Sequence, residues 1–229
     1  MILFESADVL ALEKPAGVSM ATSSKEGKSA EDAVRRLLLA CAVDPPDPLP
    51  LLVHRLDAGT SGVVLLAKNA AAHRRLSLSF QERHAQKTYR ALVWGHPVPA
   101  KGAIDLALAR DPKDGRKLRV QEDGKPSVTR YATLRRFSSL ADLELKPETG
   151  RTHQIRVHLS AKGHPIVGDD FYGGASRWHG VRDRALREAL SRLGRPMLHA
   201  QRVEIPEMGL DVEAHLPEDY EGMLALLRK

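Results

Sequence analysis

The chain has 229 residues, of which 42% are apolar and 28% charged, a composition typical of a globular protein with a sizeable core. Lys and Arg outnumber Asp and Glu by 35 to 29, and the net charge of +6 mildly favours a polyanionic partner. The single cysteine, Cys41, excludes a disulfide framework and a cysteine-rich zinc site. No apolar run reaches the roughly 18 residues of a membrane span, and the N-terminus lacks the basic region of a signal peptide. We therefore expect a cytoplasmic protein with no membrane partner, in which Cys41 is a buried structural thiol.

In the first part of the chain, capping and turn signals separate short apolar segments. Ser29 followed by Asp32 is an N-cap pattern before a helix, and Asn69 can cap a second helix that runs to about His84. The proline-rich segment 44–50 is expected to be an exposed loop. Strands are expected at 9–13, 51–53, 63–67 and 87–94.

The second part is expected to begin with a meander of short strands over 103–146, including a half-buried strand at Leu140–Leu145. A helix follows at 152–162, an amphipathic helix at 181–193, and a terminal helix that starts at Pro217. Late strands are expected at 197–204 and 210–215. Many short strands with dispersed helices indicate an α+β fold with a mixed, mostly antiparallel central sheet and flanking helices. We expect one domain over residues 1–229.

Motifs for cofactors are missing from the sequence. The GKS at 27–29 resembles the end of a phosphate-binding loop, but Thr22 stands where that motif requires glycine. His153 and His158 are five residues apart on an expected helix and so do not share a face for a metal ion. We therefore expect neither a metal nor another cofactor.

Two charged residues occur where a buried strand is expected. Residues 51–69 read LLVHRLDAGTSGVVLLAKN, which places Arg55 and Asp57 between two apolar runs. Burying a charge is costly unless it is paired and hydrogen-bonded. Arg55 and Asp57 therefore either form an ion pair with each other or have a role in the reaction at a functional site. On an extended strand the side chains of residues i and i+2 share a face, so both could point into one cleft.

Five motifs occur in an order that resembles one enzyme family. HRLDAGTSGVVLLAK resembles the signature of the RluA-type pseudouridine synthases, and EKPAGV at 13–18 resembles their early turn. KTYRALVWG, TGRTHQIRVHLSAKGHPIVGDDFYG and LHAQRVEIP resemble their later motifs. From the first to the last, the motifs span about residues 8 to 216, essentially the whole chain.

The resemblance implies the catalytic fold of these enzymes and an isomerisation of uridine in RNA that uses no cofactor. The chain starts at the catalytic domain, so the separate N-terminal RNA-binding domain of many relatives is not expected. The pair Ala58-Gly59 is smaller than in many members, which bears on contacts beside the site.

The resemblance also assigns roles to individual residues. Asp57 is implied as the nucleophile, and Arg156 as the cation that keeps it ionised, with Arg151 as the competing candidate. Tyr89 is implied to stack on the target base, and Arg55 to help hold the nucleotide out of its stack, a salt bridge being the alternative. His153 is an RNA-contacting candidate, its alternative being a core histidine.

Basic residues outside these motifs suggest where the rest of the RNA lies. We expect phosphate contacts from the hairpin loop 110–117, through Arg110, Lys113, Arg116 and Lys117. The arginines around the amphipathic helix are interleaved with acids, so a solvated face is expected there.

The resulting interpretation is an RNA pseudouridine synthase acting on structured RNA, either tRNA, rRNA or both, as a monomer. A catalytically inactive RNA-binding or ribosome-assembly protein on the same fold is the alternative. A nucleoside or glycoside hydrolase is a third possibility, but the motifs contain no obvious second carboxylate.

Overall fold

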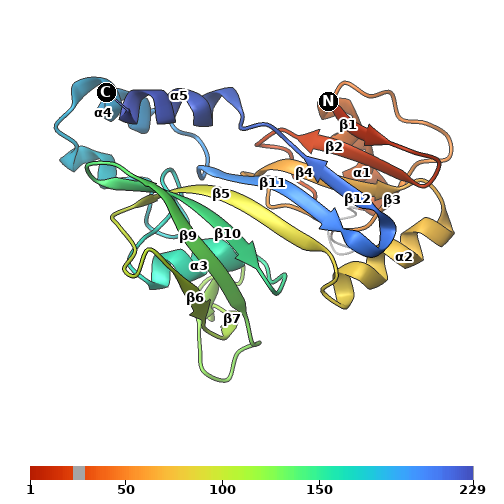
Figure 1. Cartoon of the computed structure of the whole chain (residues 1–229), viewed down its shortest axis with the longest axis horizontal. Helices are drawn as coiled ribbons and strands as arrows, with labels where there is room; N and C mark the ends of the chain where they lie inside the picture. Colours follow the sequence, from red (N-terminus) through yellow and green to blue (C-terminus); the bar gives the residue numbers. More distant parts are fainter. Residues whose placement is uncertain (23–28, 229) are drawn as a thin grey trace. The chain divides into compact units, whose positions relative to one another are not determined.

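The computed structural model describes residues 1–22 and 29–228, so Gly27 and Lys28 of the GKS motif lie outside the described residues. The chain forms two compact units (Figure 1). Unit 1 contains 1–87 and 199–215, and unit 2 contains 88–198 and the residues from 216 onward. The expectation of a single domain over 1–229 stays a prediction.

Unit 1 is built on a sheet with the strand order β1-β2-β4-β11. β3 also pairs with β4, and β12 with β11. β4 and β11 are parallel, whereas the other pairs of this unit are antiparallel. The strands are β1 (Ile2–Glu5), β2 (Val9–Lys14), β3 (Leu51–Leu52), β4 (Ser61–Ala67), β11 (Leu198–Ile205) and β12 (Leu210–Glu213).

Among its described residues, unit 1 has two α-helices, and each begins at the residue that its capping signal predicts. Ser29 caps α1 (Ala30–Ala40) in a full capping box with Asp32, and Asn69 caps α2 (Ala70–Gln81). α2 packs on β4, and its Leu76 joins Val63 and Leu65 in one core cluster. Val64 and Leu66, on the opposite face of β4, are also fully buried. Both faces of β4 are therefore covered, which explains its continuous apolar run.

Unit 2 is built on an antiparallel sheet with the strand order β5-β10-β9-β6 (Figure 1). A separate two-stranded hairpin of β7 and β8 lies between β6 and β9 in the sequence. The expected meander is confirmed. Its strands are β5 (Gln86–Trp94), β6 (Lys101–Asp105), β7 (Leu108–Arg110), β8 (Leu118–Val120), β9 (Val128–Arg136) and β10 (Leu140–Pro147).

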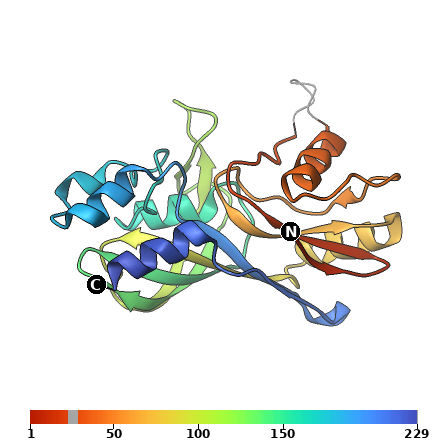
Figure 2. The ribbon, with the colours of Figure 1, turned by 90° about the horizontal axis from the view of Figure 1, so that it is seen from above.

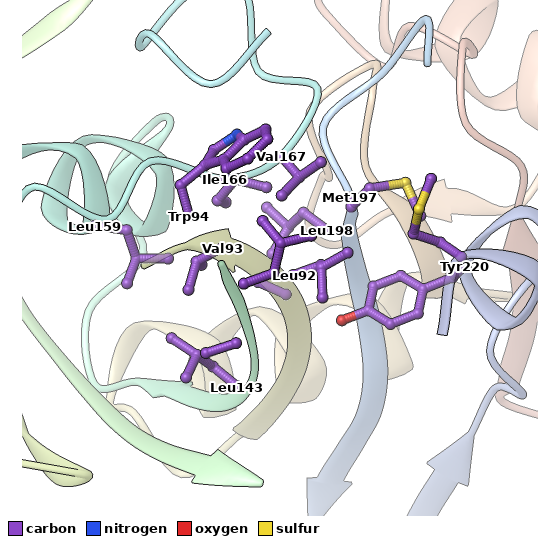
Figure 3. Packing of buried hydrophobic residues seen from close by; sticks show 14 of the residues in the cluster. Leu92, Val93, Trp94, Leu143, Leu159, Ile166, Val167, Met197, Leu198 and Tyr220 are labelled. Carbon is purple, nitrogen blue, oxygen red and sulfur yellow. The ribbon is translucent and has the colours of Figure 1, made fainter. Parts of the chain in front are cut away.

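The core of unit 2 joins strands β5 and β10 to helices that come later in the chain. Figure 3 shows Leu92 and Val93 of β5 packed with Ile166, Val167 and other apolar side chains. The helices that contribute to this core are α3 (Gln154–Ala161), α4 (Arg184–Ser191) and α5 (Glu218–Leu227). The described residues also form two short 3₁₀ helices, η2 (Arg177–Gly180) in unit 2 and η3 (Pro206–Met208) in unit 1.

The prediction of a mixed, mostly antiparallel sheet with flanking helices is confirmed. The prediction that the strand at Leu140–Leu145 is half-buried is partly wrong. In β10 the polar position Asp142 is only 3% exposed. Its carboxylate accepts hydrogen bonds from Arg90 of β5 and from the hydroxyl of Tyr220 of α5. The carboxylate is therefore buried as part of a network, which alternation alone does not reveal.

Helix bounds differ from the predictions where a single residue ends the helical backbone. The second helix ends at Gln81, before Arg83 with its left-handed φ of +67°, and α3 starts after His153, which has φ +54°. The helix expected at 181–193 is only α4, because Asp183 caps it and accepts from the Leu186 amide. Its buried residues are Leu186 and Leu190, and Ala185 is exposed.

Cys41 is buried, as predicted, and its thiol donates to the carbonyl of Glu13. Burial raises the pKa of this thiol, which suits a structural role. No helix among the described residues is long and apolar enough to cross a membrane.

Candidate active site

Arg55 and Asp57 lie in a loop between β3 and β4, and the expectation of an extended strand at this point is wrong. β3 ends at Leu52 after only two residues, and β4 begins at Ser61. Within the loop Leu56 is buried, Arg55 is exposed and Asp57 is half-buried. The Thr60 amide donates to the Asp57 carbonyl at 3.0 Å, which closes a turn immediately after the aspartate.

Lys14 holds this turn from the end of β2. Its side chain is fully buried, and its ammonium donates to the carbonyls of Pro15 at 2.9 Å, Ala58 at 3.1 Å and Thr60 at 2.7 Å. The Gly17 amide also donates to the Ala58 carbonyl, at 2.8 Å. Charge-assisted hydrogen bonds are stronger than neutral ones, so the turn beside Asp57 is held from two sides.

His54 attaches the start of the same loop to β4. Its Nε2 accepts the Leu65 amide at 2.9 Å, and its ring stacks on Phe80 of α2 at 4.5 Å between centroids. Burial, and to a lesser degree the charge of Lys87, lowers the pKa of His54 to about 3. The ring is therefore neutral near pH 7, as its accepting nitrogen requires.

The start of β4 is fixed against β11. Ser61 Oγ and His199 Nδ1 are 2.9 Å apart, and both side chains are buried. Gly62 has φ +118°, and a Cβ there would lie 2.1 Å from the Ala200 carbonyl oxygen. Only glycine permits this close approach of the two parallel strands.

Tyr89 lies on β5, in register with Leu145 of β10. It is half-buried and packs against the core cluster of unit 2. Its neighbour Arg90 forms the ion pair with Asp142 described above. A strand that pairs with β10 along most of its length, at the edge of a core, is a rigid base for an aromatic side chain.

Arg156, on α3, is 6% exposed and forms an ion pair with the fully buried Asp169. Arg156 Nε donates to Oδ2 at 2.7 Å, and Nη2 donates to Oδ1 at 2.8 Å. Asp169 was not among the residues predicted from the sequence. The predicted pair of Arg156 with Asp57 joins residues of different units and stays a prediction, as does the choice between Arg156 and Arg151.

The turn before α3 carries Arg151 and His153. Gln154 fixes the turn, because its side-chain oxygen accepts from the Arg151 amide at 3.0 Å and from the Thr149 hydroxyl at 2.7 Å. Its side-chain amide donates to Val128 of β9 at 2.9 Å. Arg151 itself is exposed.

An aromatic pair links this turn to the basic hairpin. The Tyr172 hydroxyl lies 2.9 Å from His153 Nδ1 and accepts the Leu118 amide of β8 at 3.1 Å. The Phe171 ring lies beneath Arg116 at 5.6 Å and Lys117 at 5.2 Å. Cation–π contacts of this kind hold the hairpin loop on the 169–172 turn.

The hairpin projects from unit 2, as its yellow-green loop shows in Figure 2. Arg110 and Lys113 are exposed at its tip, and Arg116 donates to Asp114 through Nε and Nη2 at 2.9 Å each. These hydrogen bonds lower the pKa of Asp114 to about 2. Exposed ion pairs are weak, so Arg116 can exchange Asp114 for a phosphate group.

The predicted site residues therefore divide between the two units. Unit 1 holds Arg55 and Asp57, and unit 2 holds the other eight, which are Tyr89, Arg110, Lys113, Arg116, Lys117, Arg151, His153 and Arg156. Sequence reasoning missed the supporting residues Lys14, Gln154, Asp169 and Tyr172. Each was already part of a quoted motif, which was the available signal. In residues 1–22 and 29–228, no group of three or more His, Cys, Asp or Glu side chains could hold a metal ion.

The sequence matches the RNA pseudouridylate synthase family over residues 8–161. It is 37% identical to the ribosomal large subunit pseudouridine synthase D of Pseudomonas aeruginosa, with 100% of this chain and 72% of that protein covered. It is also 37% identical to the dual-specificity RNA pseudouridine synthase RluA of Salmonella typhi, with 96% and 94% covered.

Solved structures show the same fold. The human RNA pseudouridylate synthase domain containing 4 has a TM-score of 0.76 and 26% identity, with 99% of this chain and 92% of that chain covered. The human RNA pseudouridylate synthase domain containing 1 has a TM-score of 0.71 and 31% identity, with 95% and 82% covered.

Proposed function

The chain belongs to the RNA pseudouridylate synthase family, and from this premise we propose that Asp57 is the nucleophile of its reaction. The protein is an RNA pseudouridine synthase, an isomerase that converts uridine in RNA to pseudouridine. The reaction breaks the N1–C1′ bond of uridine and joins C5 to C1′. The proton leaves C5 and N1 gains one, so no redox agent or nucleotide is consumed.

The loop that carries Asp57 is the observation that supports this role most strongly. The backbone next to Asp57 is held by a buried ammonium, which donates to the carbonyls of Ala58 and Thr60, and by a glycine amide. Such support is what a reacting carboxylate needs, because it must stay within about 0.5 Å of its productive position. The carboxylate would stabilise or trap the positive charge that develops at C1′ when the glycosidic bond breaks.

The other roles are those that the resemblance to the family implies. Arg156 would keep Asp57 ionised, and Tyr89 would stack on the target base and assist proton removal from C5. Arg55, exposed on the same loop as Asp57, would help hold the flipped nucleotide, whose extrusion costs a few kcal/mol.

Phosphate contacts would come from the basic hairpin together with the turn before α3. Arg110 and Lys113 are exposed at the hairpin tip, and Arg151 is exposed on the turn. His153 would act from the same turn, although its hydrogen bond to Tyr172 also gives it a structural partner. Such contacts position RNA without reading its sequence.

The substrate class in this proposal is structured tRNA, rRNA or both. One relative is named for the ribosomal large subunit and another for dual specificity, so both classes need testing. We further propose that the enzyme is cytoplasmic and consists of a single catalytic domain that is monomeric. Gel filtration with light scattering would test the oligomeric state.

The decisive experiment uses tRNA and rRNA transcripts labelled with tritium at uracil C5. We expect the wild-type protein to release tritium from one or both, and Asp57→Ala to release none while still binding RNA. Asp44→Asn, an exposed change in the proline-rich loop, is the control for loss of an acid. Release that persists in Asp57→Ala would contradict the assignment of the nucleophile, and free uracil as the end product would indicate a hydrolase.

A further inference from the structure

Asp169 holds one edge of the Arg156 guanidinium. The two hydrogen bonds use Nε and Nη2, so they fix the plane of the guanidinium as well as its position. Both side chains are buried, with 6% of Arg156 and none of Asp169 exposed. Rotation of the guanidinium would take both arginine donors away from a buried carboxylate, which is strongly unfavourable.

Asp169 is itself held by the turn that it closes. Its Oδ1 also accepts the amides of Phe171 at 3.1 Å and Tyr172 at 3.2 Å, and its carbonyl accepts the Gly174 amide at 2.6 Å. A Cβ on Gly174 would lie 1.7 Å from the Ile166 carbonyl oxygen, so the turn is closed too tightly for any other residue. The carboxylate therefore has one position relative to α3.

The aromatic side chains of the same turn face the cation. The Arg156 guanidinium carbon lies 5.6 Å from the Phe171 ring centre and 5.1 Å from the Tyr172 ring centre. The turn thus contacts Arg156 through both its carboxylate and its rings. If the buried pair of Arg156 and Asp169 served stability alone, apolar side chains could replace it. The carboxylate and the two rings together instead fix the direction of a planar donor group.

We propose that Asp169 is a positioning residue that orients Arg156 toward the reacting carboxylate. The inference rests on the proposed function, in which Arg156 keeps Asp57 ionised. A guanidinium has five N–H donors, and Asp169 takes two of them along one edge. The other N–H groups of the guanidinium can donate to a second carboxylate. Because Asp169 fixes the plane of the guanidinium, it also fixes the direction of these N–H groups.

The first test measures kcat, KM and the pH dependence of kcat for Asp169→Asn. An amide can accept from only one of the two guanidinium donors and turns its own NH₂ toward the other, so the fork reorients. We expect kcat to fall at least tenfold with KM within twofold of wild type. The acid limb of the pH profile should move to higher pH, because a misdirected Arg156 stabilises the ionised nucleophile less.

Asp142→Asn is the matched control. Asp142 is also a buried carboxylate of unit 2 that pairs with an arginine, and it has no assigned role in the reaction. If Asp169 had only a structural role, both variants would be less stable toward unfolding, and the acid limb of the pH profile of kcat would not move. An unchanged acid limb and an unchanged kcat in folded Asp169→Asn would overturn the proposal.

The second test examines the role of Asp169 without relying on the folding of Asp169→Asn. Arg156→Ala leaves the Asp169 carboxylate facing a space of the shape of a guanidinium, so guanidinium ion at non-denaturing concentration should restore part of the activity. We expect rescue in Arg156→Ala and none in Arg156→Ala/Asp169→Ala. Equal rescue in both variants would overturn the proposal.

The two tests separate this inference from the proposed function. Arg156→Ala with full activity would remove the role of Arg156, and the role of Asp169 with it. An inactive Arg156→Ala beside an active Asp169→Asn with a normal pH profile would remove only the role of Asp169.

Discussion

The two units hold their principal site residues by different means. In unit 1, the loop with Asp57 belongs to no strand or helix, and its backbone is held by hydrogen bonds from Lys14 to main-chain carbonyls. In unit 2, Arg156 is part of helix α3, and its side chain is held by the carboxylate of Asp169. A loop residue needs its backbone fixed, whereas a long side chain on a helix needs its terminal group fixed.

Lys14→Met gives the largest expected effect on the unit 1 side of this comparison. The carbonyls of Thr60 and Pro15 would lose their ammonium donor, so we expect about 2–3 kcal/mol less stability toward unfolding by urea. A loop displaced by about 1 Å should also reduce activity about a hundredfold. Lys68→Met, which removes only a surface pair with Glu5, should cost less than about 1 kcal/mol. Similar losses in the two variants would contradict the role of Lys14.

Lowering the pH tests the unit 1 loop by a second route. Because the folded-state pKa of His54 is about 3, against an ordinary value of 6.5, the folded state favours the neutral ring. This stability is fully present above pH 6.5 and is lost as the pH falls, by about 2 kcal/mol at pH 5. Urea unfolding at pH 7.5 and pH 5 measures the difference.

His54→Gln should flatten this pH dependence, whereas a change at the exposed His84 should leave it intact. The pKa of His158 in unit 2 is also lowered, chiefly by burial, so some slope in the same direction should remain in His54→Gln. An unaltered slope in His54→Gln would show that the loop anchor does not titrate as expected.

Tyr220→Phe tests whether the buried network of unit 2 is as important as the loop anchor of unit 1. Removing the hydroxyl takes one donor from Asp142, so we expect about 1–2 kcal/mol less stability and unchanged activity. Tyr131→Phe is the control, since its hydroxyl donates to the Pro99 carbonyl in an exposed position. The control should change the free energy of unfolding by less than about 0.5 kcal/mol.

Asp114→Asn should give the smallest effect on stability but a measurable one on RNA binding. The change frees Arg116 from its ion pair and removes a negative charge from the hairpin, so RNA should bind about two- to fivefold more tightly at low salt. Filter binding at several salt concentrations should show a steeper salt dependence. The same charge change at Asp44, in the proline-rich loop of unit 1, should have less effect. Equal effects at both positions would mean that only net charge matters.

Local signals predicted the elements well, and long-range contacts explain what they missed. Ser29 and Asn69 cap helices as predicted because capping depends on residues within one turn. The strand expected around Arg55 is wrong, because β3 pairs with β4 through only two residues before the loop departs. Lys14 reaches Thr60 across 46 positions in the sequence, a contact with no local signal.

The site was predicted mainly from the family resemblance, which names the reacting residues but not what supports them. Asp169 is 13 positions from Arg156, beyond the reach of helix periodicity, and only the closed turn brings it back to α3. The left-handed backbone of His153 also shortened the helix that was predicted over 152–162. Such features depend on the tertiary structure around them.

The path of the chain through the two units has a consequence for synthesis on the ribosome. Val203, Ile205 and Val212 complete the core of unit 1, yet they emerge only after more than a hundred residues of unit 2. Until then Val63 and Leu65 of the nascent chain lack part of their apolar cover, and β4 lacks its parallel neighbour. Exposed strand edges and apolar surface favour aggregation, so we expect the nascent chain to be most prone to aggregation through unit 1, until β11 has emerged.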